Sequence, residues 1–199
     1  MARPDRDLRE ACIAEAMAIV AGDGVERLSL REVARRLGVS HQAPYKHFPS
    51  RDHILAAIVA RAFAAFARFL DRNPRSDDAD ADLGGMGLAY LDYARAHPLE
   101  YRLMFGTPLP DGRAHPEMMA EARHAFALLC DGLRRRAAAR GEQPDDKAIV
   151  LDALFIWSCL HGLAGIHGAS LVDTLALPPG ALEASPAHVL GRIGDALGH

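Results

Sequence analysis

The sequence predicts an all-α protein with a small N-terminal domain and a larger C-terminal one. Apolar residues recur at spacings of three and four through most of the 199 residues, which is the period of an amphipathic helix. The strand pattern, in which apolar and polar residues alternate, is nearly absent. Half of the residues are apolar, which is enough for a sizeable core.

Two helices are expected at the start of the chain. The first extends from Pro4 to Gly22, because proline favours the first helical position and glycine ends a helix. The second begins after Ser29, which has the spacing of a complete capping box with Glu32. Gly38 ends this helix after about two turns.

A third short helix is expected from Ser40 to Phe48, before Pro49 breaks it. Pro44 lies inside this helix and lacks a backbone N–H, so it is expected to tighten or bend the first turn. Two short helices joined by Gly-Val-Ser have the length and turn of a helix-turn-helix. An ordinary helical hairpin is the structural alternative.

A second domain, residues 50–199, follows a first domain of residues 1–49. Its most apolar segment, 148–166, contains a single charged residue, Asp152. The segment is about long enough to cross a membrane, but Asp152 and His161 argue against a span. Because a helix that is apolar all round must be covered all round, we expect it to pair with a second copy of the chain. Helices are expected at residues 51–72, 82–96, 98–105, 116–133, 144–168 and 185–197, with loops at 73–78 and 106–115.

The charge is distributed unevenly along the chain. Residues 1–75 contain 13 Lys and Arg against 9 Asp and Glu, whereas the remainder contains 10 against 17. A basic first part suits a DNA-binding head. The three cysteines form no CxxC pair and indicate buried thiols in a reducing compartment. The N-terminus lacks the apolar core of a secretory signal, so we expect a cytoplasmic protein.

Two runs of residues are more specific than these patterns. The run GVERLSLREVARRLGVSHQAPYKHFPSRDHILAAIVARAF, residues 24–63, resembles the DNA-binding domain of the TetR family, and the similarity covers about residues 6–65. The run WSCLHG, residues 157–162, is similar to TetR-type sensor domains that carry a Trp-His-Gly signature. The resemblance implies a homodimeric transcriptional regulator that binds a palindromic operator and is released by a small, largely apolar effector. The resemblance also implies repression as the default action of the regulator.

The resemblance also implies which residues meet DNA. The start of the third helix would enter the major groove, where Gln42 can pair with adenine, Lys46 can reach guanine and Ala43 can touch a thymine methyl. Phosphate contacts would fix the register of the protein on the duplex. For Lys46 and His47 the alternative is a solvated side chain without contact. The expected DNA-binding set is Ser29, Ser40, His41, Gln42, Ala43, Tyr45, Lys46, His47 and Arg51, of which Ser29, Tyr45, His47 and Arg51 suit phosphates.

The effector would bind among the C-terminal helices, between large or adaptable side chains. Trp157 and His161 are four residues apart and share a helix face, and His161 is either hydrogen-bonded structure or a polar anchor for the effector. The alternative for every candidate is that it fills the core. The candidates are Tyr90, Tyr93, Met104, Phe105, Met119, Phe126, Phe155, Trp157 and His161.

Other classes of function have weaker support. Cys159 and His161 point roughly 200° apart on a helix, so a shared metal ion is not expected. No GxSxG, HExxH, P-loop or GxGxxG motif indicates an enzyme, and neither a cofactor nor a membrane partner is expected. The rival function is an architectural DNA-binding protein without an effector, which would need no cavity.

Overall fold

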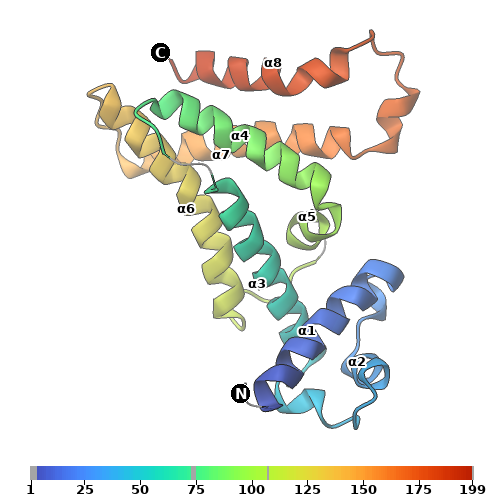
Figure 1. The fold of residues 1–199 in the computed structure, drawn as a ribbon. Helices are drawn as coiled ribbons and strands as arrows, with labels where there is room; N and C mark the ends of the chain where they lie inside the picture. The colour runs from blue at the N-terminus through green and yellow to red at the C-terminus, as the bar shows by residue number, and fades with distance from the viewer. Residues whose placement is uncertain (1–3, 73–74, 107, 199) are drawn as a thin grey trace. The chain divides into compact units, whose positions relative to one another are not determined.

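The protein is helical wherever the structure describes it as regular (Figure 1). In this computed structural model no strand occurs among the described residues, which confirms the all-α class. The described residues are 4–72, 75–106 and 108–198.

The helices form two compact units, and each unit draws on two stretches of the chain. Unit 1 comprises Met1–Ala65 and Leu99–Ala122, and unit 2 comprises Phe66–Pro98 and Arg123–His199. The compact unit that contains the N-terminal helices therefore extends past residue 49 and includes the start of the long helix that follows.

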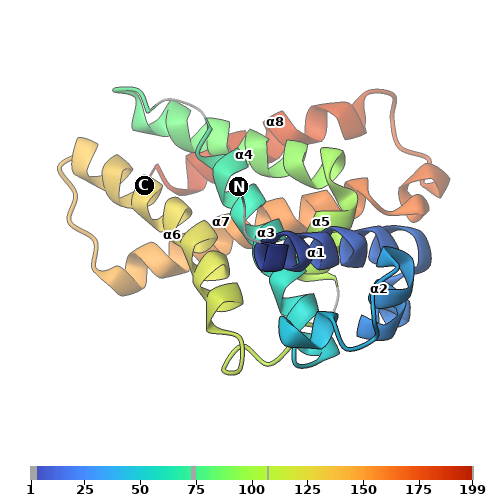
Figure 2. The same cartoon turned by 60° about the horizontal axis from the view of Figure 1, so that its bottom comes forward.

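Unit 1 contains the helix-turn-helix region. Figures 1 and 2 show its first two helices side by side, in agreement with their many close contacts. Its elements are α1 (Pro4–Asp23), η1 (Val25–Arg27), α2 (Leu30–Leu37), η2 (Pro44–Lys46), most of α3 (Arg51–Leu70), most of α5 (Pro98–Phe105) and the start of α6 (Pro116–Ala139).

Helix α2 begins and ends where the sequence predicts. The Ser29 hydroxyl accepts a hydrogen bond from the Glu32 N–H at 3.1 Å, which satisfies one of the free donors at the helix start. Gly38 takes the left-handed conformation, φ 67°, and ends the helix. The expected capping box is only half formed, because the Glu32 carboxylate binds Arg35 and Arg36 instead of turning back to the cap.

The expectation of a third helix at Ser40–Phe48 is wrong. Turns and the short 3₁₀ helix η2 replace it. Pro44 has no N–H for the Ser40 carbonyl, which accepts from the Ala43 N–H at 2.9 Å instead. The longer α-type pattern returns only where the Phe48 N–H binds the Pro44 carbonyl, also at 2.9 Å. The effect of Pro44 thus extends over the whole segment.

The core of unit 1 joins α1, α2 and α3. Leu30, Val33 and Phe48 are buried, as the sequence predicts. An ion pair between Glu10 and Arg61 ties the surface of α1 to that of α3. The largest buried side chains of these helices and their connections include Ile13, Ile19, Leu28, Val33, Ile54 and Ile58.

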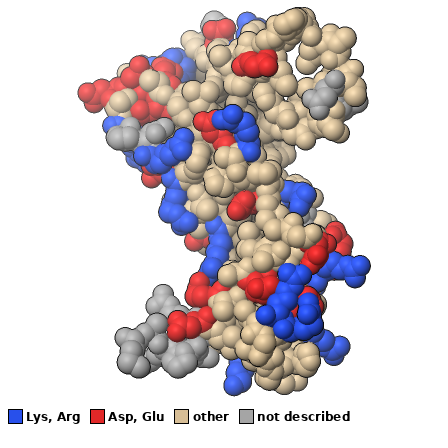
Figure 3. Space-filling view, turned by 45° about the vertical axis from the view of Figure 1, so that its right-hand side comes forward, with Lys and Arg blue, Asp and Glu red and all other residues tan. Residues whose placement is uncertain are grey.

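Unit 2 contains α4, α7 and α8 together with most of α6 and the end of α3. Helices α4, α7 and α8 all contact one another, and α4 lies against both of the others in Figures 1 and 2. Figure 3 brings forward the end of this unit where α7, η3 and α8 follow one another, and few charged side chains are visible there. The elements are the end of α3, α4 (Ala79–Ala96), most of α6, α7 (Asp146–His167), η3 (Ser170–Thr174) and α8 (Ala181–Ala196).

Helix boundaries in unit 2 differ from the predicted ones by a few residues. Helix α4 begins three residues earlier, because the Asp78 carboxylate accepts from the Ala81 N–H at 2.9 Å and caps it. Helix α8 begins at Ala181, so Pro186 lies inside it. The missing N–H of Pro186 would have bonded the Leu182 carbonyl, and the Ser185 hydroxyl donates to that carbonyl at 2.7 Å instead.

Ion pairs fasten the start of α4 to the end of α6. The Arg136 Nε donates to Asp80 at 2.6 Å, and Arg140 approaches the same carboxylate at 3.1 Å. Arg135 pairs with Asp82 at 2.9 Å. Arg136 is nearly buried, so its guanidinium depends on this carboxylate for charge compensation.

Candidate nucleic-acid interface and ligand site

Four side chains of unit 1 line an open groove at the helix-turn-helix. They are Arg31 on α2, His41 and Gln42 in the turn, and Tyr45 on η2, and the groove has a volume of about 560 Å³. All four are exposed. A guanidinium, an imidazole, an amide and a phenol together can bind phosphate oxygens and base edges.

The segment of residues 40–48, which forms part of this groove, has both buried and exposed side chains. Pro44 and Phe48 are buried, whereas His41, Gln42 and Tyr45 are exposed. Lys46 and Ser40 are exposed, whereas Ala43 and His47 are half-buried. The structure thus brings together the exposed members of the expected DNA-binding set on one segment, which is a tight turn and not a helix.

Arg31 is a groove residue that the sequence reasoning did not nominate. It lies beside Leu30, which is core, and two residues before Val33, also core. Because successive helical residues are rotated by about 100°, Arg31 points away from the face that those two residues bury. The same helical spacing, applied to the polar face of α2, would have found it.

The side chains of Arg51 and Ser29 both form hydrogen bonds within the protein. The Arg51 guanidinium donates to the Leu28 carbonyl at 3.0 Å and to the Val25 carbonyl at 2.7 Å. Ser29 uses its hydroxyl to cap α2. Any phosphate contact by these two residues comes in addition to those bonds.

Charge pairs hold the outer surface of α2. The Arg35 and Arg36 side chains, hydrogen-bonded to the Glu32 carboxylate, lower the pKa of Glu32 to about 2. Arg36 also forms ion pairs with Asp23 and with Glu15. These arginines are therefore partly neutralised, and this leaves Arg31 as the α2 arginine that lines the groove.

In unit 2, a hydrogen-bonded group links α4 to α7. The Trp157 Nε1–H donates to the Tyr90 hydroxyl at 3.2 Å, and the same hydroxyl lies 3.1 Å from His161 Nδ1. The rings of Phe66 and Phe126 pack edge-on against Tyr90 and Trp157, respectively. Because Trp157 and His161 are four residues apart on one face of α7, one hydroxyl on the facing helix contacts both.

The remaining ligand candidates are not brought together in the same way. Tyr93 is buried and its ring packs against those of Phe66, Phe69 and His97, as a core residue does. Phe155 is 43% exposed on the surface of α7. The other three belong to unit 1: Met104, which is buried, and Phe105 and Met119, which are half-buried.

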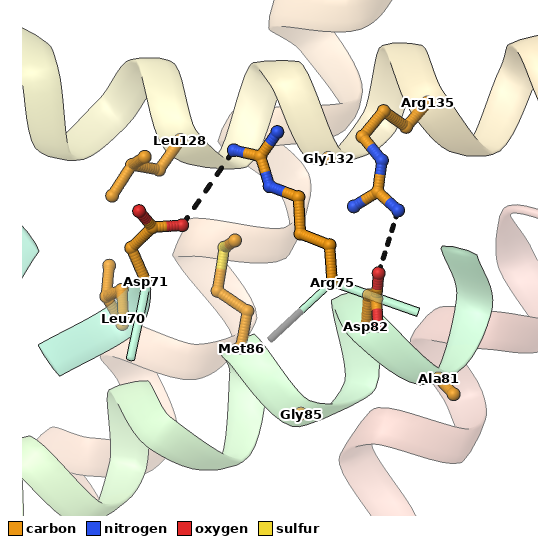
Figure 4. A pocket seen from close by; sticks show the side chains of 10 residues that line it. All are labelled: Leu70, Asp71, Arg75, Ala81, Asp82, Gly85, Met86, Leu128, Gly132 and Arg135. Atoms are coloured by element: carbon orange, nitrogen blue, oxygen red, sulfur yellow. Dashed lines mark hydrogen bonds and ion pairs between the residues drawn. The ribbon is translucent and has the colours of Figure 1, made fainter. Parts of the chain in front are cut away.

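A small cavity in unit 2 involves residues that the sequence reasoning missed. It has a volume of about 100 Å³ and lies between the end of α3, α4 and α6 (Figure 4). In Figure 4 the Met86 side chain lies beside the Arg75–Asp71 pair, and the Arg135–Asp82 pair lies on the other side of the Arg75 side chain. The other lining residues are Leu70, Ala81, Gly85, Leu128 and Gly132. Sequence spacing could not indicate this cavity, because small residues leave space only where helices meet.

Two family models match this chain. The model described as "Bacterial regulatory proteins, tetR family" matches residues 13–58, and the one described as "Tetracyclin repressor-like, C-terminal domain" matches residues 83–187. Together with the exposed helix-turn-helix groove, they define the class as helix-turn-helix transcriptional regulators. The chain belongs to the TetR family.

Individual relatives are similar over most of the chain. The Mycobacterium tuberculosis "Uncharacterized HTH-type transcriptional regulator Rv0681" is 26% identical over 175 residues, which are 88% of this chain and 77% of the relative. A solved structure of a protein with unknown function from Rhodococcus sp. RHA1 is 28% identical, with a TM-score of 0.74, and covers 96% of this chain and 93% of its own. A tetR-family regulatory protein from Rhodococcus RHA1 has a TM-score of 0.67 at 18% identity and covers 94% and 96%, which is a likeness of fold.

Proposed function

We propose that this protein is a repressor that binds a palindromic operator as a homodimer and leaves it when a small, largely apolar effector binds. The exposed groove of unit 1 carries the proposal, because it presents Arg31, Gln42 and Tyr45 together beside the turn. A DNA-binding domain and a ligand-binding C-terminal domain are given by the family. Repression, the operator and the effector are our inference.

We assign direct reading of bases to the turn and to η2. Gln42 can pair with adenine through its amide, and Lys46 can reach guanine. His41 and Ala43 lie beside them, and Arg31 approaches the same groove from α2. Ser29, Tyr45 and His47 remain our candidates for phosphate contacts, and Ser40 remains in the wider DNA-binding set.

We propose that α7 forms the dimer interface. Leu151, Leu154 and Phe155 are exposed on one side of this helix, and Ile166 continues the apolar surface toward its end. By length and composition α3 and α7 could each cross a membrane. On α7, however, Asp152 would then lie in lipid at a high free-energy cost. In our proposal a second copy, and not lipid, covers the apolar residues. The protein is then cytoplasmic.

A two-fold dimer has a direct consequence for the operator. It carries two identical grooves related by the axis, so its operator is a palindrome with half-sites about one helical turn apart. The α7 and α8 helices of both copies would form a four-helix bundle around that axis.

We assign effector recognition to unit 2. The group of Tyr90, Trp157 and His161 offers hydrogen-bonding atoms within aromatic surroundings. The nearby candidate Phe126 adds apolar surface. An architectural protein without an effector would need neither this group nor the cavity beside Met86, so we favour the sensor over that alternative.

The test is a binding selection on fragments of the source genome with the purified dimer, at near-physiological salt, read by sequencing. Enrichment of a palindrome near the gene for this protein would support an operator-binding regulator. Binding without enrichment, which weakens steeply with salt on every sequence, would contradict sequence-specific regulation and favour the architectural alternative. The Arg31→Ala and Gln42→Ala double variant serves as the control that should lose the enrichment.

A further inference from the structure

We propose that Arg51 is a positioning residue for DNA reading: it fixes the start of α2 and, through it, the placement of Arg31. This inference rests on the proposed DNA-binding function. It assigns to Arg51 a task different from the phosphate contact expected from the sequence, and it predicts a different response to salt.

The geometry begins with one guanidinium that serves two carbonyl oxygens. Arg51 is the first residue of α3, and its Nε and Nη2 donate to Leu28 and Val25 at 3.0 and 2.7 Å. A planar guanidinium can hold two acceptors in a fixed fork, whereas the single ammonium of a lysine cannot reproduce that arrangement. Nη1 faces the Asp52 carboxylate, 3.7 Å away.

Both acceptors belong to the segment that leads into α2. Val25 begins η1, and its carbonyl also accepts from the Leu28 N–H at 3.2 Å. Leu28 is buried and directly precedes Ser29, the cap of α2. The guanidinium therefore fixes the last backbone turn before the cap, and this turn sets where α2 starts.

The start of α2 carries Arg31 into the groove. Arg31 is the second residue of the helix and lines the groove with Gln42 and Tyr45. A small rotation of the α2 start would therefore move the Arg31 side chain relative to the turn. Arg51, the first residue of α3, thus contacts η1 and the connection that precedes α2.

A double-mutant cycle on DNA affinity tests the proposal. Arg51→Lys keeps the positive charge and removes the fork, and we expect it to weaken binding to the selected operator about tenfold. If Arg51 acts through Arg31, then Arg31→Ala will cost several-fold less in the Arg51→Lys background than in the wild type. Lys46→Ala is the matched control, because Lys46 lies on η2, and its cost should be the same in both backgrounds. Costs of Arg31→Ala that are equal in the two backgrounds would overturn the proposal.

Salt dependence separates this role from a phosphate contact. We expect Arg51→Lys and Arg51→Ala to weaken binding with an unchanged slope of log affinity against log salt. A phosphate contact would instead reduce the slope by about 1 in Arg51→Ala and leave it unchanged in Arg51→Lys. That outcome would also overturn the proposal.

A measurement on the free protein distinguishes failure of this inference from failure of the proposed function. Amide hydrogen exchange of the α2 start should accelerate in Arg51→Lys, with exchange in α7 unchanged. If the exchange of α2 does not change, the positioning role is wrong whether or not the protein binds an operator. If it changes as expected and the wild type selects no operator, the proposed function alone fails.

Discussion

At the scale of single residues, two side chains decide how the chain presents its polar groups. Pro44 cannot donate to Ser40, so the segment tightens into turns and displays His41 and Gln42 at the surface. Tyr90, in contrast, binds polar groups inside unit 2. Its hydroxyl accepts from the indole N–H of Trp157 among aromatic rings, where an unsatisfied donor would cost free energy.

Gln42→Ala should relax sequence preference more than it weakens nonspecific binding. The amide of Gln42 reads a base edge in our proposal, and a lost base contact costs about 1–3 kcal/mol on the correct sequence alone. Competition binding against operators with single substitutions will measure this. Gln143→Ala, an exposed glutamine outside the helix-turn-helix, is the matched control. Equal losses on all sequences would show that Gln42 reads no base.

Tyr90→Phe should lower the free energy of unfolding by about 1–2 kcal/mol, because it removes a hydroxyl that the Trp157 N–H and His161 share. Chemical denaturation measures the loss. The chain contains one tryptophan, so its fluorescence reports directly on this group and should shift in the variant. Unchanged fluorescence together with unchanged stability would contradict the shared hydrogen bonds.

At the scale of elements, helix ends and helix pairs determine where surfaces lie. Ser29 and Gly38 confine α2 to eight residues, Leu30–Leu37, which keeps Arg31 close to the turn. The aspartates at the start of α4 bind the arginines at the end of α6. Substitutions at Gly38 and at Asp80 test the helix end and the ion pairs separately.

Gly38→Ala should destabilise the protein by about 1 kcal/mol, because an alanine is strained in the left-handed conformation. A Cβ at this position would meet no atom within 4 Å, so the cost comes from the backbone alone. Gly22 has the same open surroundings but lies within α1. Gly22→Ala should therefore stabilise the protein by about 0.5–1 kcal/mol. Thermal or urea unfolding of both variants checks the pair, and the same sign in both would contradict it.

Asp80→Asn should flatten the acid side of the stability curve. The hydrogen bond from Arg136, assisted by Arg140, lowers the pKa of Asp80. A carboxylate with a lowered pKa stabilises the folded protein above its unfolded pKa of about 4, and this stabilisation is lost as the pH falls through the lower folded value. Urea unfolding between neutral pH and pH 2.5 measures the curve. Asp77→Asn, an exposed residue in the connection before α4, is the control, and an equally flattened curve there would contradict the assignment to Asp80.

At the scale of the whole molecule, the apolar side of α7 is exposed to solvent. Leu151, Leu154 and Phe155 remain exposed although the helix belongs to the most apolar part of the chain. In our proposal a second copy covers them, and dimerisation then sets the spacing of the two grooves. An effector can change DNA affinity only if it binds one arrangement of the dimer better than the other.

Leu151→Asp should shift the protein from dimer to monomer and reduce operator affinity at least tenfold, since each dimer would bury two unpaired carboxylates. Sedimentation measures the association, and operator binding is measured at the same concentrations. Leu109→Asp places the same charge at an exposed leucine of unit 1 and should leave association unchanged. A wild-type monomer at micromolar concentration would contradict the proposed interface.

Much of the helical architecture could be predicted from the sequence, because local interactions determine it. The Ser29 cap, the Gly38 end and α5 lie where spacing and capping chemistry place them. The apolar period also identified Leu30, Val33 and Phe48 as core. The third helix was wrong because the loss of one donor at Pro44 outweighed the cap signal at Ser40.

The sequence by itself determined that this is a helical regulator with a helix-turn-helix near its start, since period, caps and motif depend on residues close together in the chain. Only the tertiary structure decided which side chains share a site. Tyr90 meets Trp157 and His161 across more than sixty positions, and Arg51 turns back to Leu28 and Val25. No local pattern encodes such pairs, because their distances depend on how whole helices pack.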